Sequence, residues 1–158
     1  MAIAWRDQMS IDQGIIDADH KSLIDLVNTV DAVPPGPAMQ RDIAAILDRL
    51  NAYTRVHCRR EERLQAAMHF INESAHGLYH ASVMRDLDAL RAQSKRRMRG
   101  RQVLAFQRRV SVALHDWLID HIVRSDSLMK PFITQLRTDA EGELPLADEV
   151  RQVEATLR

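Results

Sequence analysis

Apolar side chains recur at helical spacing in four stretches of the chain, and no stretch shows the β-branched alternation typical of strands. The four stretches run from Ile16 to Val30, from Ile43 to Met68, from His76 to Leu90 and from Val103 to Leu128. Each apolar stripe needs a partner face that removes it from water. The pattern therefore predicts an all-α fold, an up-down-up-down four-helix bundle with short connections.

Proline and glycine are scarce, so they mark the connections between the helices clearly. Residues 33–37, with three prolines and one glycine, form the strongest breaker and separate the first two helices. Gly77, Gly100, Pro131 and Gly142 are weaker interruptions. The cap of the first helix is expected near Asp17.

The chain divides into a bundle, residues 1–135, and a C-terminal tail, residues 136–158. The tail carries apolar residues at helical spacing, namely Leu146, Val150, Val153 and Leu157. This spacing predicts a short amphipathic helix that packs on its own bundle. Binding of a partner protein through residues 138–158 is the alternative.

Five of the seven residues from Lys95 to Arg101 are basic. Such a run is typical of a solvated helix end, because cations interact favourably with the C-terminal end of the helix dipole. Docking of an acidic protein partner on residues 95–101 is the alternative. The oligomeric state stays open.

The charge balance and the cysteine content exclude several classes of protein. The 158 residues include 22 basic and 22 acidic side chains, and a formal net charge of zero argues against nucleic-acid binding. Uninterrupted apolar runs are too short for a membrane span or a signal peptide. The single cysteine, Cys58, excludes an internal disulfide and favours a reducing, cytoplasmic compartment.

Polar groups interrupt the apolar stripes at seven positions, drawn from all four predicted helices. They are five histidines and two carboxylates: His20, His57, Glu61, His76, His80, His121 and Asp126. Burial of such groups costs free energy unless they are paired or bind a metal. One buried histidine would be an ordinary core residue, but seven polar groups on facing stripes predict a metal centre inside the bundle.

The spacing of these residues limits how they can meet. Two pairs are four residues apart, His57 with Glu61 and His76 with His80, so each pair projects from one helical face. His121 and Asp126 are five residues apart, or about 140° around an α-helix, and would approach one centre from different angles.

Seven donors are too many for a structural zinc, which takes four ligands. They suit two metals of higher coordination number that share carboxylates, and imidazole with carboxylate is compatible with iron, copper, zinc or nickel. A single zinc held by the two pairs at four-residue spacing is the alternative. It would leave His20, His121 and Asp126 unexplained.

The polar positions fall within short motifs in a fixed order. The motifs are Ile16-Asp17-Ala18-Asp19-His20, His57-Cys58-Arg59-Arg60-Glu61-Glu62, His76-Gly77-Leu78-Tyr79-His80, Trp117-Leu118-Ile119-Asp120-His121-Ile122, and finally Asp126. Over about residues 1–132 this order resembles the hemerythrins, specifically the single-domain bacterial type. All seven ligand positions of that family have a matching residue here.

The resemblance implies two non-haem irons with different coordination. His76, His80 and His121 would hold one iron and fill its coordination sphere. His20 and His57 would hold the other, which would keep an open position for O2. Glu61 and Asp126 would bridge both irons together with an oxo or hydroxo group.

The resemblance also implies reversible O2 binding for storage, delivery or sensing, without catalysis. Nitric oxide and small anions would be other ligands of the open iron. An apolar pocket beside that iron would be lined by Leu23, Cys58, Trp117, Leu118 and Ile122. At Cys58 the family usually has phenylalanine, so we expect a smaller pocket wall and faster oxidation of the iron.

Two other functions remain open for such a site. One is a redox enzyme that reduces nitric oxide or peroxide or oxidises iron, and the other is a sensor that signals through a separate partner. A ferritin-like site would need a second Glu-x-x-His motif beside residues 73–76 and further glutamates on the stripes, which the sequence lacks. His69 and His115 match no ligand position and are predicted to be surface or cap residues.

Overall fold

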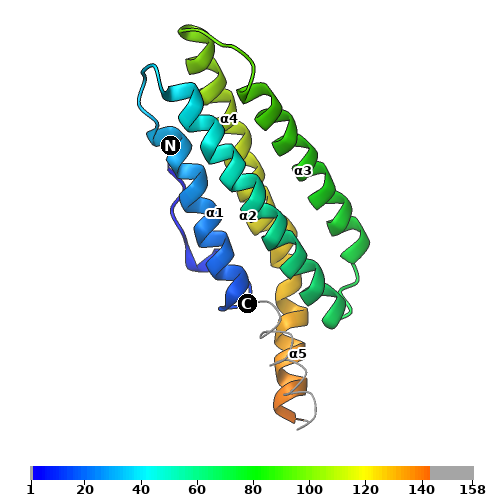
Figure 1. The fold of residues 1–158 in the computed structure, drawn as a ribbon. Coiled ribbons are helices and arrows are strands. Elements are labelled where there is room, and N and C mark those ends of the chain that lie inside the picture. The colour runs from blue at the N-terminus through cyan, green and yellow to red at the C-terminus, as the bar shows by residue number, and fades with distance from the viewer. Residues whose placement is uncertain (1, 143–158) are drawn as a thin grey trace.

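The computed structural model describes residues 2–142, with side chains as far as residue 138. The helices are α1 (Ile15–Ala32), α2 (Met39–Ala67), α3 (Glu73–Ser94), α4 (Arg101–Asp120) and α5 (Lys130–Gly142). Three short helices complete the order: η1 (Asp7–Met9) precedes α1, and η2 (His121–Ser125) and η3 (Asp126–Met129) link α4 to α5. Helices α1 to α4 alternate in direction, and α5 extends past one end of the bundle (Figure 1). Since residues 2–142 contain no strand, the predicted all-α four-helix bundle is confirmed.

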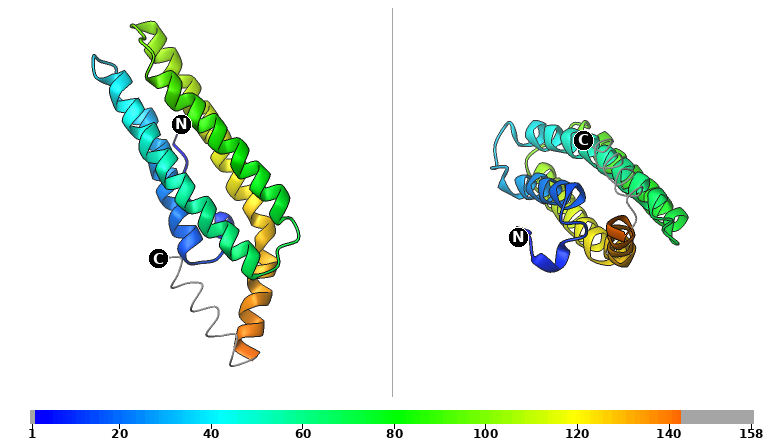
Figure 2. Two further views of the ribbon diagram at one scale, coloured as in Figure 1. Left: turned by 45° about the vertical axis from the view of Figure 1, so that its right-hand side comes forward. Right: turned by 90° about the horizontal axis from the view of Figure 1, so that it is seen from below.

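The helices pack in a ring in which α2 and α4 lie diagonally opposite each other (Figure 2). Leu23, Val27, Leu47, Val110 and Leu118 are completely buried in the main core between the helices. A second apolar cluster joins the start of α1 and the end of α2 to η3 and α5, and it contains Ile16, Leu64, Met68, Phe70, Met129 and Ile133. This smaller cluster fixes the end of the bundle where the predicted metal ligands lie.

The start of α1 differs in detail from the prediction, because the capping side chain is Asp12 and not a residue near Asp17. The Asp12 carboxylate accepts hydrogen bonds from the N–H groups of Gly14, Ile16 and Asp17 at 2.8 to 3.1 Å. Asp17 lies in the first turn, and its carboxylate accepts from the N–H of Ile11 at 2.6 Å. These bonds fix the helix start one turn before His20.

Helix α2 ends in a Schellman motif. His69 adopts a φ of 50°, in the left-handed region, and its N–H donates to the carbonyl of Ala66. The N–H of Phe70 donates to the carbonyl of Gln65, and the Phe70 side chain is buried. The motif turns the chain sharply towards α3 and confirms that His69 is a cap residue.

The predicted fourth helix is divided in the structure. It does not continue to Leu128 as one α-helix, because α4 ends at Asp120 and is followed by the π-helical turn η2 and the 3₁₀ turn η3. Pro131 is the second residue of α5, a position where its missing N–H is tolerated. Gly77, in contrast, lies inside α3 and does not interrupt it.

Helix α5 runs through the predicted boundary between residues 135 and 136 and ends at Gly142. The amphipathic helix expected around residues 146–157 lies outside the described residues. No helix within residues 2–142 has the length and apolar content needed to cross a membrane.

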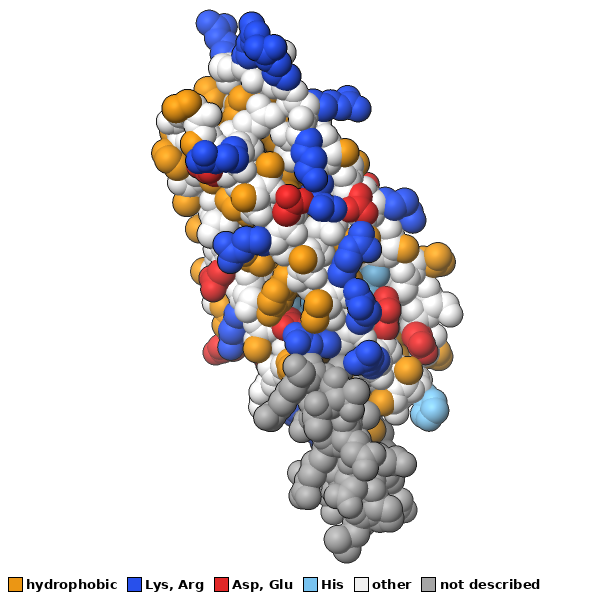
Figure 3. Space-filling model, in the orientation of Figure 1, with side chains coloured by type: hydrophobic (Ala, Val, Ile, Leu, Met, Phe, Trp, Pro, Cys, Tyr) orange, Lys and Arg blue, Asp and Glu red, His pale blue; other side chains and the backbone are white. Residues whose placement is uncertain are grey.

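The basic residues from Lys95 to Arg101 lie at the end of the bundle formed by the α3–α4 connection, where Figure 3 shows a group of Lys and Arg side chains. The five basic side chains of this run are exposed, as expected for a solvated helix end. The backbone is held by Gln40, whose amide nitrogen donates to the carbonyls of Ser94 and Arg96. The metal-ligand candidates lie towards the opposite end.

Candidate metal centre

The alternating helices bring all seven predicted ligands to one end of the bundle. His20 is near the start of α1, His57 and Glu61 are in the last part of α2, and His76 and His80 are in the first turns of α3. His121 and Asp126 begin η2 and η3. Each of the seven residues is at most 4% exposed.

The π-helical turn η2 explains how His121 and Asp126 reach the same point. The N–H of Asp126 donates to the carbonyl of His121, which is the bond of a residue to the fifth residue before it. That bond places the two side chains one above the other. The angular separation of about 140° expected for an α-helix is therefore wrong here.

Asp126 lies between histidines from three helical segments. One carboxylate oxygen, Oδ2, is 3.1 Å from His20 Nε2 and 3.3 Å from His121 Nε2. The other oxygen, Oδ1, is 3.2 Å from His76 Nε2. Its two oxygens therefore face histidines on different sides of the site.

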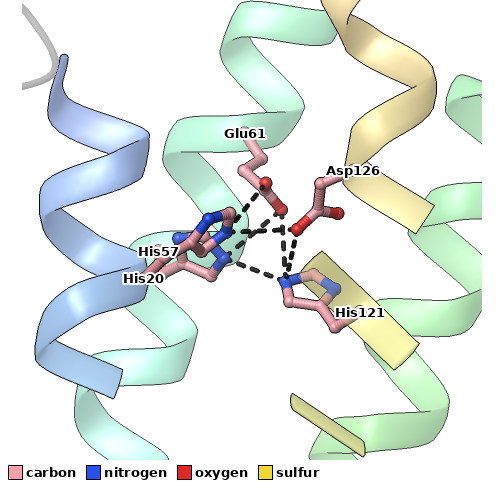
Figure 4. Close-up of side chains that lie close together, drawn as sticks. All are labelled: His20, His57, Glu61, His121 and Asp126. Carbon is pink, nitrogen blue, oxygen red and sulfur yellow. Dashed lines mark hydrogen bonds and ion pairs between the residues drawn. The ribbon is translucent and has the colours of Figure 1, made fainter. Parts of the chain in front are cut away.

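Glu61 has a similar position on the other side of the cluster. Its Oε1 is 3.8 Å from His20 Nε2, and its Oε2 is 3.5 Å from His57 Nε2 and 3.1 Å from His80 Nε2. His57 Nε2 and His121 Nε2 are 3.0 Å apart. Figure 4 shows His20, His57, Glu61, His121 and Asp126 converging from α1, α2 and the segment after α4.

The donor atoms form two overlapping groups, each compact enough to surround one ion. The first group contains His20, His57, Glu61, His121 and Asp126, and the second contains Glu61, His76, His80 and His121. Within each group the ligand atoms lie within 4.8 Å of one another. Because Glu61 and His121 are common to both groups, the two candidate positions are adjacent.

The donor atoms that face the centre lack other partners. His20 Nε2, His76 Nε2, His80 Nε2 and all four carboxylate oxygens of Glu61 and Asp126 are buried without a hydrogen bond to any residue that the structure describes. Leaving so many polar atoms unsatisfied inside a protein is costly. The arrangement fits a metal site, since a cation would satisfy these atoms together.

The charge states within the cluster differ from residue to residue. Burial raises the pKa of the Glu61 and Asp126 carboxyls, but the surrounding histidines outweigh burial and hold each pKa below its ordinary value. Burial lowers the pKa of His121 well below its ordinary value. Ionised carboxylates and a neutral imidazole are the forms that bind metal ions, so both carboxylates and His121 already have the form that binds one. Burial lowers the pKa of His80, but Cys58 and Glu61 outweigh burial and raise it to about 11, and Asp126 raises the pKa of His20 against the effect of burial. These two imidazoles would release a proton on binding a metal.

Three further residues lie beside the outer nitrogens of the histidine rings. Glu62 Oε1 is 3.1 Å from His80 Nδ1, where it can accept a hydrogen bond, and the Gln65 amide nitrogen is 2.8 Å from His76 Nδ1, where it can donate one. The Asp19 carboxylate is 3.6 Å from His57 Nδ1. Such partners fix the orientation of a histidine that binds metal through Nε2.

Asp19 is itself held firmly. It accepts two hydrogen bonds from Arg60 at 2.7 and 2.9 Å and one from the Tyr53 hydroxyl at 2.8 Å. The sequence interpretation did not assign a function to Asp19, Glu62 or Gln65. Their only sequence signal is that Asp19 and Glu62 adjoin His20 and Glu61, and that Gln65 is four residues after Glu61 on the same face.

The predicted pocket residues lie around the same end of the bundle. Leu23, Leu118 and Ile122 are completely buried, and the Cys58 side chain is 5% exposed. Burial raises the pKa of the Cys58 thiol although His80 beside it acts in the opposite direction, so the thiol stays protonated. Cys58 is therefore a small apolar side chain rather than a reactive one.

Two aromatic rings stack on His121. The Trp117 and Tyr79 ring centres are each 5.8 Å from the His121 ring centre, with angles of 21° and 19° between the ring planes. Both aromatic residues also line a surface groove of about 1030 Å³ between α3, α4 and the N-terminal segment. Tyr79 was not singled out as a site residue, although it lies between His76 and His80 in the sequence.

His69 and His115 are not part of the cluster. His69 is exposed at the end of α2, and His115 Nε2 is 3.6 Å from the Asp31 carboxylate on α1. The prediction of a surface or cap residue is confirmed for His69, whereas His115 lies within α4 and its side chain is only 16% exposed.

Crystal structures of hemerythrins have the same fold. A wild-type hemerythrin superposes with a TM-score of 0.66 at 23% sequence identity, covering 83% of this chain and 97% of that one. Two hemerythrin variants, each altered at one leucine, superpose with TM-scores of 0.66 and 0.67 at 22% and 23% identity, covering 84% of this chain and 98% of theirs. At 22% to 23% sequence identity, this similarity shows a shared fold.

No curated protein matches the chain in sequence. The family model described as "Hemerythrin HHE cation binding domain" matches residues 13–133, which include all seven clustered residues. The match covers most of the chain and contains the buried histidine and carboxylate cluster. The chain therefore belongs to the hemerythrin family.

Proposed function

We propose that this chain binds O2 reversibly at a centre of two non-haem iron ions. The observation that supports this proposal is the cluster of seven buried donors, whose two carboxylates each face histidines on both sides. A carboxylate with its two oxygens directed at two neighbouring positions is suited to bridge two metals. A single tetrahedral zinc would use only four of the seven donors.

The histidines are divided unequally between the two proposed irons. His76, His80 and His121 would hold one iron, and His20 and His57 would hold the other. Glu61 and Asp126 would serve both irons together with an oxo or hydroxo group. Held by one histidine fewer, the second iron would have a coordination position for a small ligand, and the two irons would supply the electrons for reversible O2 binding.

The chain's own side chains control access to that position. Leu23, Leu118 and Ile122 are completely buried and exclude water from the cluster. Trp117 and Tyr79 stack on His121, a ligand of the other iron, and line the surface groove, so they separate that side of the cluster from the solvent. An apolar wall of this kind favours a small neutral ligand such as O2 over water and large anions.

The test is an anaerobic optical titration of the reduced, iron-loaded protein with O2, followed by an argon purge. Reversible binding predicts a charge-transfer absorption band that grows with O2 and disappears on purging, with two irons per chain. Matched variants are His57→Ala, which should lose the band, and His69→Ala, which should keep it. Rapid irreversible oxidation would favour a redox enzyme or redox sensor instead.

A further inference from the structure

The side of α4 that faces away from the core carries exposed apolar residues in a regular order. Among the described residues, eight large apolar side chains are exposed, and four of them, Leu104, Val112, Ile119 and Val123, are on α4 and η2. Val112 is 60% exposed and Ile119 is 37% exposed. The buried residues of α4 lie on the opposite side of the helix. Figure 2 shows α4 on the outside of the bundle.

This outer face of α4 has the spacing of a helix–helix seam. Ala105, Val112 and Ile119 are exposed and follow one another at intervals of seven residues. A heptad interval keeps apolar residues aligned along one line of contact between two helices. Arg108, Arg109 and Asp116 are exposed between them on the same side, and the Arg109 guanidinium lies over the Phe106 ring.

The face is self-complementary if a second copy of α4 lies antiparallel to it, with the two Val112 side chains opposite each other. Ala105 and Ile119 are equally far from Val112, and so are Arg108 and Asp116, which are each four residues away. In an antiparallel pair of α4 helices, the small Ala105 would meet the large Ile119 of the second copy. Arg108 would meet the second copy's Asp116, and a two-fold axis makes each pairing occur twice.

Two of the exposed charged residues on this side of α4, Arg108 and Asp116, are available for such contacts. Neither Arg108 nor Asp116 has an ion-pair partner within the described part of the chain. They are eight residues apart, or about 12 Å along the helix, so they do not pair with each other. A parallel pair of α4 helices would place Arg108 beside Arg108, so the charges select the antiparallel arrangement.

We propose that the outer face of α4 is a self-association surface, on which two copies of the chain pair antiparallel about Val112. The seam from Ala105 to Ile119 is about 21 Å long. A single helix pair of this length buries less area than a permanent dimer needs. The dimer is therefore weak and depends on protein concentration.

The first test is sedimentation equilibrium of the full chain from about 5 to about 500 µM, a range suited to a weak interface. The wild type shows a monomer–dimer equilibrium. Arg108→Asp and Asp116→Arg each raise the dimer dissociation constant by at least about tenfold, because each brings like charges together. The double variant Arg108→Asp/Asp116→Arg returns the constant to within about threefold of the wild type, since the pairs are restored in reverse.

The control variant is Arg85→Asp, which makes the same charge change at an exposed position of α3. It leaves the dissociation constant unchanged. A wild type that stays monomeric to about 500 µM overturns the proposal, and so does a dimer that the double variant fails to restore.

A second test uses the two-fold axis itself, because Val112 is the residue of the seam that meets its own copy. Val112→Cys should form a disulfide-linked dimer under mild oxidation. Ala92→Cys, at an exposed position of α3, should not. Equal cross-linking of the two variants would overturn the antiparallel arrangement.

Discussion

The two nitrogens of His80 have different neighbours, and the difference decides how this ring can bind a metal. Nε2 lies 3.1 Å from Glu61 Oε2, at the centre of the cluster, whereas Nδ1 lies 3.1 Å from Glu62 Oε1. A histidine whose Nδ1–H donates to a carboxylate presents the lone pair of Nε2 to the metal. The negative charge of the carboxylate also makes that lone pair more basic.

Glu62→Gln tests this second carboxylate. The amide keeps a hydrogen-bond acceptor beside His80 but removes the charge, so we expect the metal affinity to fall by about tenfold. Competition between the protein and a chelator for Co²⁺ measures the affinity. Glu73→Gln, at an exposed position of α3, should leave the affinity unchanged. An equal loss in both variants would indicate a general effect of charge rather than the contact with His80.

Cys58 carries a second prediction at the scale of one side chain. Cys58→Phe fills more of the space beside the cluster and makes the wall larger. We therefore expect slower oxidation of the reduced, iron-loaded protein by O2. The measurement is the rate of the absorption change in air-saturated buffer.

The matched control is Cys58→Ser, which keeps the size of the side chain and should not slow oxidation. Because Cys58 is buried beside His80, the phenylalanine variant also needs a check that its helix content and iron content are unchanged. An oxidation rate equal to that of the wild type in an intact Cys58→Phe protein would contradict the prediction.

At the scale of the helix, α3 contains a glycine that the structure does not require. A Cβ added at Gly77 would meet no atom within 4 Å, and the residue lies within regular helix. Gly77→Ala should therefore stabilise the fold by about 0.5–1 kcal/mol, because alanine loses less backbone entropy on folding. Urea unfolding of the metal-free protein measures the free energy without a contribution from metal binding.

Gly100 provides the contrasting substitution. It has a φ of 45°, in the left-handed region, at the start of α4. Gly100→Ala should destabilise the protein by about 1 kcal/mol, because an L-residue is strained there. Stabilisation by both substitutions would show that the backbone at Gly100 is not constrained as the structure has it.

The sequence predicted some features of the helices and not others, depending on whether a feature follows from the periodicity of the side chains. The apolar stripes predicted the four helices and the polar residues predicted their common site, because both depend on periodicity alone. The π-helical turn at His121 could not be predicted, since one inserted residue leaves the stripe nearly unchanged. The contacts of Asp19, Glu62 and Gln65 with histidines depend on the packing of neighbouring helices, which a single stripe does not show.

At the scale of the whole molecule, the proposed iron site, the basic run and the proposed self-association surface lie on different parts of the bundle. The proposed iron site lies between the helices at the end next to α5, whereas the exposed basic run from Lys95 to Arg101 lies towards the opposite end. The proposed self-association surface is on the outside of α4. The basic run is separate from both, but Asp116 and Ile119 of the self-association surface also line the groove of Trp117 and Tyr79, so pairing of two copies would cover part of that groove.

The metal centre also links function to the stability of the entire bundle, because its candidate ligands come from α1, α2, α3 and the η2 and η3 turns that follow α4. Several buried donor atoms have no hydrogen-bond partner among the described residues, and a bound cation would satisfy them. A metal that binds only the folded state stabilises it, by about 2.7 kcal/mol per site at a free concentration one hundred times the dissociation constant. For a chain of this size we expect the melting temperature to rise by about 5–10 °C for each site filled.

Differential scanning calorimetry of the metal-free protein during titration with Co²⁺ or Fe²⁺ checks this expectation. The rise should continue to two metal equivalents per chain, and metal analysis should give the same number. Glu61→Gln weakens the ligand shared by both positions, so its melting temperature should respond little to metal. His115→Gln, which lies outside the cluster, should behave like the wild type. A rise that ends at one equivalent would favour a single-metal site, because the second group of donors would then contribute nothing to folding.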